Sequence, residues 1–175
     1  MTMTLTTRRL HLRPLEYTDA RHFARLFGHD RDAIAMTATL PDLLNEEEAA
    51  KWIARRLRDS KGFAICQAGD GLFIGAIGYG AVLDRIELGY GMGRPFWGHG
   101  YATEAVREVV RFARTDGISM IEACTFPSNP ASARVLEKNG FKNLGRISRN
   151  YPQRGGQQAV FHHVLDLTKN PDRLG

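Results

Sequence analysis

The sequence predicts an α/β fold in which helices cover a mixed sheet. Strand-like segments joined by tight turns stand near both ends of the chain, and helical segments separate strands in its middle. A length of 175 residues suits one domain spanning residues 1–175. A doubly wound parallel fold fits less well, because its strands and helices would alternate more strictly.

The first half of the chain begins with a predicted strand and two predicted helices. Residues 10–15 alternate apolar and basic side chains, as an edge strand does. Start signals at Thr18 and Asp19 place a helix over residues 20–27, and residues 28–42 are expected to be irregular. Asn45 and three glutamates begin a helix that runs to about residue 59. Its inward face is expected to hold Ala49, Trp52, Ile53, Ala54 and Leu57.

The remaining elements follow in a clear order. Strands are predicted over residues 63–67, 72–79 and 86–92, the first two joined by a glycine-containing turn. From Ala102 to Ala113 apolar residues recur at i, i+3, i+4, i+7, i+8 and i+11, which predicts a strongly amphipathic helix. The last predicted elements are strand 121–126, helix 130–139 and strands 142–149 and 158–167.

Composition excludes several classes of protein. With 43% hydrophobic and 25% charged residues, the chain is neither disordered nor collagen-like. Its apolar runs fall short of the roughly 20 residues of a membrane-spanning helix, and its first nine residues lack the apolar core of a signal peptide. Cys66 and Cys124 are too few for a disulfide framework and are interpreted as core residues. We therefore expect a cytoplasmic protein that does not bind membranes.

The net charge of +5 is concentrated in one segment. Five lysines and arginines, and no carboxylate, lie between Lys138 and Gln157. Such a patch can bind nucleic acid, an acidic protein or a phosphorylated small molecule, although a solvated face is the simpler interpretation. Few aromatic residues and no RNA-binding signature accompany it, so nucleic acid is not the expected partner.

Glycines share one face of the predicted strand 86–92. Because side chains alternate in a strand, one face carries Glu87, Gly89, Gly91 and, just beyond, Gly93. Tyr90 points to the opposite face and is expected to lie in the core. The glycines leave room either for a ligand to approach or for a helix to pack closely.

A second glycine-rich segment stands directly before the amphipathic helix, over residues 97–103. Glycines there expose backbone N–H groups at the start of a helix, which predicts a phosphate-binding turn. The spacing matches neither the dinucleotide-binding fingerprint nor the P-loop, so NAD and ATP are not expected. An ordinary strand-to-helix turn is the alternative.

At these residues the sequence resembles the GNAT superfamily of acyl-CoA-dependent N-acyltransferases, and most of all its RimJ/RimL-type branch of ribosomal-protein N-terminal acetyltransferases. Residues 97–102 match the Gly and Gly/Ala positions of the family's Q/R-x-x-G-x-G/A loop, with Trp97 in place of Gln or Arg. Residues 12–15, 87–90 and 129–141 match further family motifs. The resemblance spans nearly the whole chain in the right order.

The resemblance implies a mostly antiparallel sheet that splays at its centre and is flanked by about four helices. Acetyl-CoA would lie where the strand ending at Met92 parts from the strand ending at Phe126, with its pyrophosphate on backbone N–H groups from Gly98 to Thr103. Arg134 and Lys138, one helical turn apart, are candidates for the ribose phosphate. The residues expected to bind acetyl-CoA are Tyr90, Gly91, Met92, Trp97, Gly98, His99, Gly100, Tyr101, Ala102, Thr103, Asn129, Ser132, Arg134 and Lys138. For His99 an exposed loop position is the simpler interpretation.

Two polar residues begin the predicted helix 130–139. Asn129, before Pro130, suits an ordinary N-cap, and the family's asparagine at this place contacts the pantetheine arm. Many members carry farther along this helix a tyrosine that protonates the departing thiolate. That position is Leu136 here, which cannot donate a proton. Ser132 is therefore the expected substitute, acting by a hydrogen bond to the thiolate.

Glu87 is the expected general base, because it shares the position of a glutamate that serves in some family members. A carboxylate in a partly desolvated cleft has a raised pKa and can take a proton from an amine directly or through water. A surface carboxylate or an anionic anchor for the amine are the alternatives. A backbone N–H near Met92 would meet the charge on the carbonyl oxygen. His162 and His163 point in opposite directions along one strand, and no metal site is expected.

Together these inferences predict an enzyme that moves an acetyl group from acetyl-CoA to a primary amine by direct attack on the thioester. The acceptor is the N-terminus of a ribosomal or other protein, or a small amine, and the enzyme is a monomer or homodimer. One alternative is a catalytically inactive acyl-CoA-binding sensor, which the absent tyrosine permits. Another is a ribosome- or RNA-associated protein that uses the basic segment.

Overall fold

The computed structural model describes residues 3–42 and 44–169, whose strands form one sheet in the order β1-β2-β3-β4-β5-β6-β8-β7. All neighbouring strands pair antiparallel except β5 and β6, so the predicted mixed, mostly antiparallel α/β fold is confirmed. No described helix is long and apolar enough to cross a membrane. The strands are β1 (Leu5–Thr6), β2 (Leu10–Pro14), β3 (Ser60–Gln67), β4 (Phe73–Val82), β5 (Arg85–Met92), β6 (Met120–Thr125), β7 (Lys142–Tyr151) and β8 (Gly156–Asp166).

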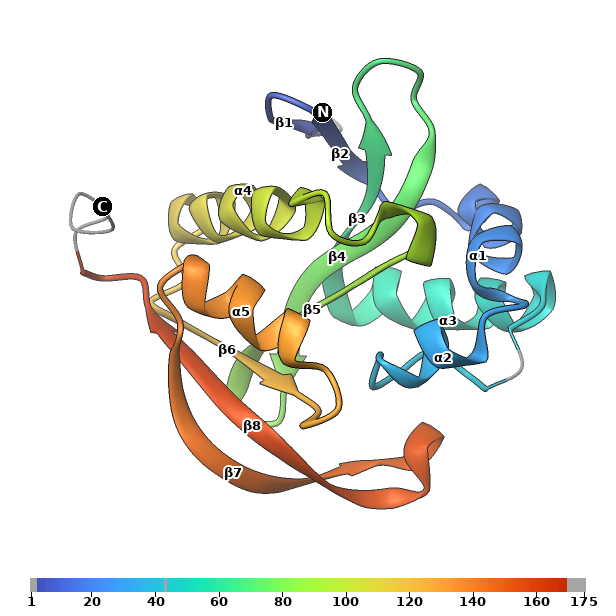
Figure 1. Cartoon of the computed structure of the whole chain (residues 1–175). Helices are drawn as coiled ribbons and strands as arrows, with labels where there is room; N and C mark the ends of the chain where they lie inside the picture. The colour runs from blue at the N-terminus through green and yellow to red at the C-terminus, as the bar shows by residue number, and fades with distance from the viewer. Residues whose placement is uncertain (1–2, 43, 170–175) are drawn as a thin grey trace.

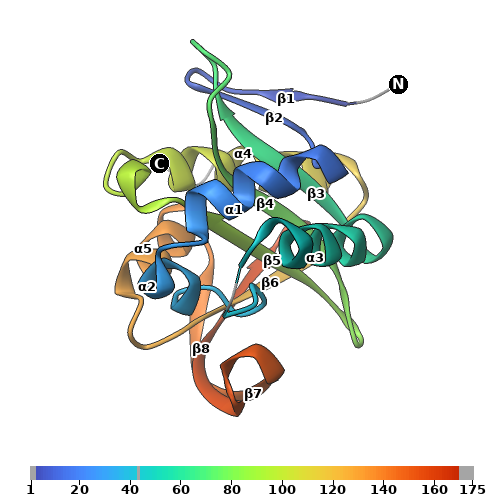
Figure 2. The ribbon, with the colours of Figure 1, turned by 90° about the vertical axis from the view of Figure 1, so that its right-hand side faces the viewer.

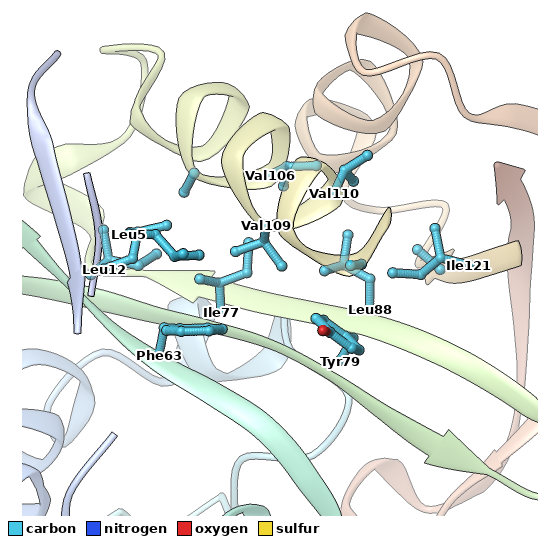
Figure 3. Close-up of a cluster of buried hydrophobic side chains, with 14 of the residues drawn as sticks. Leu5, Leu12, Phe63, Ile77, Tyr79, Leu88, Val106, Val109, Val110 and Ile121 are labelled. Atoms are coloured by element: carbon cyan, nitrogen blue, oxygen red, sulfur yellow. The ribbon is translucent and has the colours of Figure 1, made fainter. Parts of the chain in front are cut away.

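Helices cover both faces of this sheet (Figures 1 and 2). On one face, Val106 and Val109 of α4 pack on Leu12, Ile77 and Leu88, which come from strands β2, β4 and β5 (Figure 3). On the other face, aromatic residues of α1 and α3 form a second buried cluster with β4. The helices are α1 (Ala20–Phe27), α2 (Arg31–Ala35), α3 (Glu46–Asp59), α4 (Tyr101–Thr115) and α5 (Pro130–Lys138).

The sheet parts at its centre. Strands β5 and β6 share a single parallel register pair, Glu87 with Glu122. Beyond that pair β5 continues to Met92 and β6 to Thr125, and the two ribbons diverge toward α4 and α5 (Figure 1). The splayed centre implied by the resemblance is therefore present.

Three local predictions were wrong or incomplete. The segment expected to be irregular contains α2, which Asp30 caps by accepting a hydrogen bond from the Ala33 N–H. The two-residue strand β1 was not predicted. Leu57 is 37% exposed rather than inward. At about 100° per residue it lies some 80° from Ala49 around α3, whereas Arg56 continues the buried stripe.

Arg154, in the turn between β7 and β8, ties that hairpin to the chain after α2. Its guanidinium donates to the carbonyl oxygens of Ile34 at 2.6 Å, Thr37 at 2.8 Å and Leu40 at 2.9 Å. Its side chain is only 9% exposed. Arg154 belongs to the basic segment whose simplest interpretation was a solvated face, and for this residue that interpretation is wrong. The cation instead pairs the carbonyl oxygens of Thr37 and Leu40, which no backbone N–H group of the described residues pairs, and adds a further donor to that of Ile34.

Replacing this arginine should loosen residues 34–40. Arg154→Met keeps much of the apolar stem but leaves the carbonyl oxygens of Thr37 and Leu40 without their donor, at a cost of about 3 kcal/mol. We expect the melting temperature to fall by roughly 6–12 °C, measured by thermal unfolding. Arg146→Met, an exposed position on the same hairpin, is the control and should change it by far less. Equal effects of the two variants would contradict the structural role.

Candidate active site

A cavity of about 1250 Å³ opens where β5 and β6 part. Its wall combines β5, the N-termini of α4 and α5, the ends of β6 and β7, and residues 36–40 after α2. Glu87 and every residue predicted to bind acetyl-CoA except His99 lie on this wall. The fold thus gathers into one cavity side chains that are up to 51 positions apart in the sequence.

The N-terminus of α4 presents unpaired backbone donors to this cavity. Within the described part of the chain, no N–H group from Gly98 to Thr103 donates to a backbone oxygen. Gly98 and Gly100 have positive φ angles of 76° and 79°, a conformation that suits glycine. A Cβ at Gly98 would meet no atom within 4 Å, so the turn leaves open space above its donors. Such a turn is a ready site for a phosphate group.

Arg9 and Glu104 hold this turn in place. The Glu104 carboxylate accepts hydrogen bonds from the Arg9 backbone N–H at 2.9 Å and the Arg9 Nε at 2.7 Å. Arg9 Nη1 donates to the His99 carbonyl at 2.8 Å, and the guanidinium lies 4.5 Å from the Tyr101 ring centroid. Burial works against ionisation, but hydrogen bonds from Thr7 and Arg9 lower the pKa of Glu104. Arg9 therefore both fixes the turn and offsets the negative charge of Glu104 beside it.

The edge of β5 that faces β6 also carries free backbone groups. The Gly93 N–H donates to the Ile74 oxygen of β4 at 3.0 Å. Along a strand of an antiparallel pair, the backbone N–H and C=O groups of successive residues point to opposite edges. Those of Gly91 therefore also point toward β4, whereas those of Tyr90 and Met92 point toward the opposite edge. That edge borders the cavity. The indole Nε1 of Trp97 occupies one acceptor there, the Met92 oxygen, at 2.7 Å.

The glycine face of β5 both allows a helix to pack closely and leaves room for a ligand. A Cβ at Gly93 would come within 2.2 Å of the Leu26 side chain, so this glycine allows α1 to pack closely. A Cβ at Gly91 would lie 3.3 Å from Thr37. At Gly89 it would meet nothing within 4 Å, which leaves open cavity.

Tyr90 and Ser132 meet across the parted strands. The Tyr90 hydroxyl lies 2.8 Å from the Ser132 Oγ and donates to the Ser132 carbonyl at 3.1 Å. Asn129 caps α5 by accepting from the Ser132 N–H at 3.2 Å. Tyr90 packs against the core as expected, but its hydroxyl reaches the cavity. Burial raises the pKa of Tyr90, so the phenol stays protonated. Leu136, in contrast, is fully buried.

Glu87 belongs to the single register pair between β5 and β6, and its side chain lies on the face toward α3. Burial raises the pKa of its carboxyl group, and the positive charges of Arg85 and Arg56 oppose that shift. Arg56 Nη2 donates to the Thr39 hydroxyl at 2.8 Å, which anchors the chain after α2 over the cavity. Tyr151 of β7 completes this wall.

The cysteines and histidines give no sign of other chemistry. Cys66 is buried, but Cys124 is half-buried on the cavity wall rather than in the core. Burial raises the pKa of Cys124 to about 11. His163 hydrogen-bonds Thr125 in the core while His162 contacts Glu122. Residues 3–42 and 44–169 contain no group of side chains arranged to hold a metal ion.

Sequence reasoning missed four residues of this site: Arg9, Arg56, Arg85 and Tyr151. Arg9 lies in the N-terminal stretch and Tyr151 in the basic segment. No motif in either segment marked these residues as part of a site. Arg56 was detectable in principle, because a cation that continues an otherwise apolar helical stripe must face something polar.

Strand order and pairing, with the sheet parting beside the N-terminus of α4, define the fold of the acyl-CoA-dependent acyltransferases. A family model described as the acetyltransferase (GNAT) domain matches residues 9–142. The chain is 33% identical to the probable N-acetyltransferase YjcK of Bacillus subtilis, over 93% of this chain and 95% of that protein. It therefore belongs to the GNAT family and is an acetyl-CoA-dependent N-acetyltransferase.

Solved structures share this fold at low sequence identity. A GNAT-family acetyltransferase from Bacillus anthracis superposes with a TM-score of 0.81 at 20% identity, covering 95% of this chain and 100% of that one. RimL, a ribosomal α-N-protein acetyltransferase in complex with coenzyme A, superposes with a TM-score of 0.80 at 17% identity, covering 94% and 98%. The predicted resemblance to the GNAT family and its RimJ/RimL-type members is confirmed.

Removing the Arg9 guanidinium should weaken acetyl-CoA binding. Arg9→Gln releases the His99 carbonyl and leaves the Glu104 charge uncompensated beside the turn. Because Arg9 is partly exposed, we expect the dissociation constant of acetyl-CoA to rise by roughly threefold to tenfold. Isothermal titration measures it, with Arg8→Gln, an exposed neighbouring arginine, as the matched control. An unchanged constant in Arg9→Gln would show that the turn keeps its shape without the guanidinium.

Proposed function

We propose that this enzyme acetylates a primary amine, either a protein N-terminus or a small amine, by direct attack of the amine on the thioester. The observation that carries the proposal is the position of Glu87. It lies in the cavity at the parting of β5 and β6, next to a strand edge that offers unpaired backbone donors. A base and an oxyanion-stabilising donor are the two groups that amide formation from an ammonium substrate needs.

The free backbone donors fit the predicted placement of acetyl-CoA. N–H groups from Gly98 to Thr103 suit its pyrophosphate, which a helix N-terminus binds without a side-chain cation. The edge of β5 at Tyr90 and Met92 suits the amides of pantetheine. Arg134 and Lys138 border the same cavity from α5 and suit the ribose phosphate. A GNAT-fold relative, RimL, has been solved in complex with coenzyme A.

Each protein group then has a distinct role. When bound, acetyl-CoA supplies a thioester whose carbonyl carbon accepts the amine nitrogen and whose sulfur leaves as a thiolate. Glu87 takes the proton of the ammonium group, and the Met92 N–H donates to the carbonyl oxygen. Ser132, oriented by the Tyr90 hydroxyl, donates a hydrogen bond to the thiolate. This arrangement compensates for the family tyrosine that Leu136 replaces.

Direct attack is favoured over an acetyl-cysteine intermediate. Burial raises the pKa of Cys124 to about 11, so its thiol is protonated and weakly nucleophilic at neutral pH. Cys66 is buried in the cluster under α1 and α3. Cys124 therefore lacks the thiolate needed to attack the thioester, and Cys66 is shielded from it by burial.

Thermal unfolding with acetyl-CoA, followed by a screen for thiol release with amines, tests the proposal. At a hundredfold excess over its dissociation constant, a ligand selective for the folded protein stabilises it by about 2.7 kcal/mol. We expect a rise of several degrees in melting temperature and release of CoA with at least one amine. Stabilisation without release by any amine would instead identify an acyl-CoA-binding sensor. No stabilisation at saturating acetyl-CoA would contradict the placement of the ligand.

Two variants separate the roles of base and thiolate donor. Because burial raises the pKa of Glu87 and the ionised form is the base, wild-type kcat/KM should fall tenfold per pH unit below that raised pKa. Glu87→Gln should lose about a hundredfold in kcat/KM, together with this acidic limb. Ser132→Ala should keep the acidic limb of the pH profile of kcat/KM, lower kcat by about tenfold and leave acetyl-CoA affinity unchanged.

Each variant is the control for the other. Full activity of Glu87→Gln at neutral and mildly acidic pH would refute its role as the base. If Ser132→Ala lost acetyl-CoA affinity rather than turnover, the serine would be a binding residue.

A further inference from the structure

Two arginines on the cavity wall lack the partners that buried cations require. Arg85 of β5 and Arg149 of β7 both line the cavity, and their side chains are only 21% and 24% exposed. The Nε atom of each is fully buried and has no hydrogen-bond partner within residues 3–42 and 44–169. Buried guanidinium groups are normally hydrogen-bonded and paired, because desolvation of a charge is costly.

The carboxylates around these arginines do not satisfy them. Arg85 Nη1 and Arg149 Nη2 lie 3.7 Å and 4.0 Å from the same atom, Glu122 Oε2. That oxygen is already 2.7 Å from the His162 Nε2. Asp84 lies 3.7 Å from Arg85 Nε but is 92% exposed, so water screens it. Two guanidinium groups and an imidazole thus converge on one carboxylate oxygen. Glu87 interacts with the charge of Arg85, but within residues 3–42 and 44–169 it forms no ion pair with either arginine, so both guanidinium groups keep free N–H donors.

The register of the sheet places this cluster next to Glu87. Arg85 and Glu87 are two residues apart on β5 and share a face, with their Cα atoms about 7 Å apart. Glu122 is the direct register partner of Glu87. An anionic group held by Arg85 and Arg149 would therefore lie within a few bonds of an amine held at Glu87.

We infer that the acceptor is a primary amine that also carries a carboxylate near its amino group. This inference rests on the proposed function and narrows its acceptor. The amine lies at Glu87, and the carboxylate lies between Arg85 and Arg149. Planar guanidinium groups match a carboxylate by paired N–H donors, which an ammonium group does not. The carboxylate belongs either to a free amino acid or to an acidic residue at the start of a peptide.

Matched acceptor pairs test the inference on the wild-type enzyme, with no dependence on how a variant folds. Each pair consists of a free amino acid and its carboxamide, or of a short peptide beginning with Asp or Glu and the same peptide beginning with Asn or Gln. With rates compared at equal concentrations of unprotonated amine, kcat/KM should be at least tenfold higher for the carboxylate member. The pair that shows the larger ratio identifies the source of the carboxylate.

Variants then locate the group that recognises the carboxylate. Arg149→Gln should reduce the preference about tenfold while changing the rate with the carboxamide by less than twofold. Arg85→Gln should reduce the preference by a similar factor, and its rate with the carboxamide should fall as well, because Arg85 also opposes the raised pKa of Glu87. Arg149→Lys, which keeps the charge but loses the paired donors, should recover only part of the preference. Arg146→Gln, at an exposed position of β7, is the control and should leave the preference intact.

Failure of the inference differs from failure of the proposed function. If carboxamides react as fast as carboxylates, or if both glutamine variants keep the wild-type ratio, the carboxylate site does not exist although acetyl transfer does. If acetyl-CoA stabilises the protein and no amine releases thiol, either in these two sets or in the wider amine screen, the proposed function itself fails; if only amines without a carboxylate release thiol, the inference alone fails. A variant that no longer responds to acetyl-CoA in thermal unfolding is replaced by its lysine counterpart.

Discussion

The parting of β5 from β6 is the constraint on which the rest of this structure depends. A sheet opened in its middle exposes two strand edges, whose polar groups must be paired by something other than the sheet. The apolar face of α4 stabilises the opened sheet by covering it on one side. It packs on Leu12, Ile77 and Leu88 from one half of the sheet and on Ile121 and Leu165 from the other. One hydrophobic cluster thereby spans the gap and leaves the opposite side of the opening as a cavity.

Around that opening the structure places two different sets of hydrogen-bond donors. At α4, backbone N–H groups face the cavity, and Arg9 acts from behind the turn through the His99 carbonyl. On the sheet face, the donors are the guanidinium groups of Arg85 and Arg149. Backbone donors at a helix start suit a phosphate whatever else the ligand carries, whereas paired guanidinium donors also match the planar carboxylate of an acceptor. The two halves of the cavity therefore suit the two substrates of an acetyl transfer.

Much of the fold followed from local patterns. Apolar spacing from Ala102 to Ala113 predicted α4, and the alternation around Glu87 predicted which face of β5 carries its glycines. Local patterns failed where burial is decided by a partner distant in sequence. Leu57 is apolar, as core residues are, but it lies outside the face of α3 that packs on α1 and the sheet. Residues 36–40 follow the end of α2, and Arg154, over a hundred positions away, supplies the donors for the carbonyl groups of Thr37 and Leu40.

By itself, the sequence determined the order of most elements and the glycine turn before α4, because periodicity, capping and turn chemistry act over a few residues. Its motifs also resembled those of the GNAT family. Only the tertiary structure decided which role each cation of the basic segment, residues 138–157, has. Of its five cations, Arg154 supports the fold, Arg149 faces the cavity and Lys138 borders it. Their charge is equal in the sequence. Their roles differ because desolvation and the nearness of an acceptor depend on which strands and helices surround each side chain.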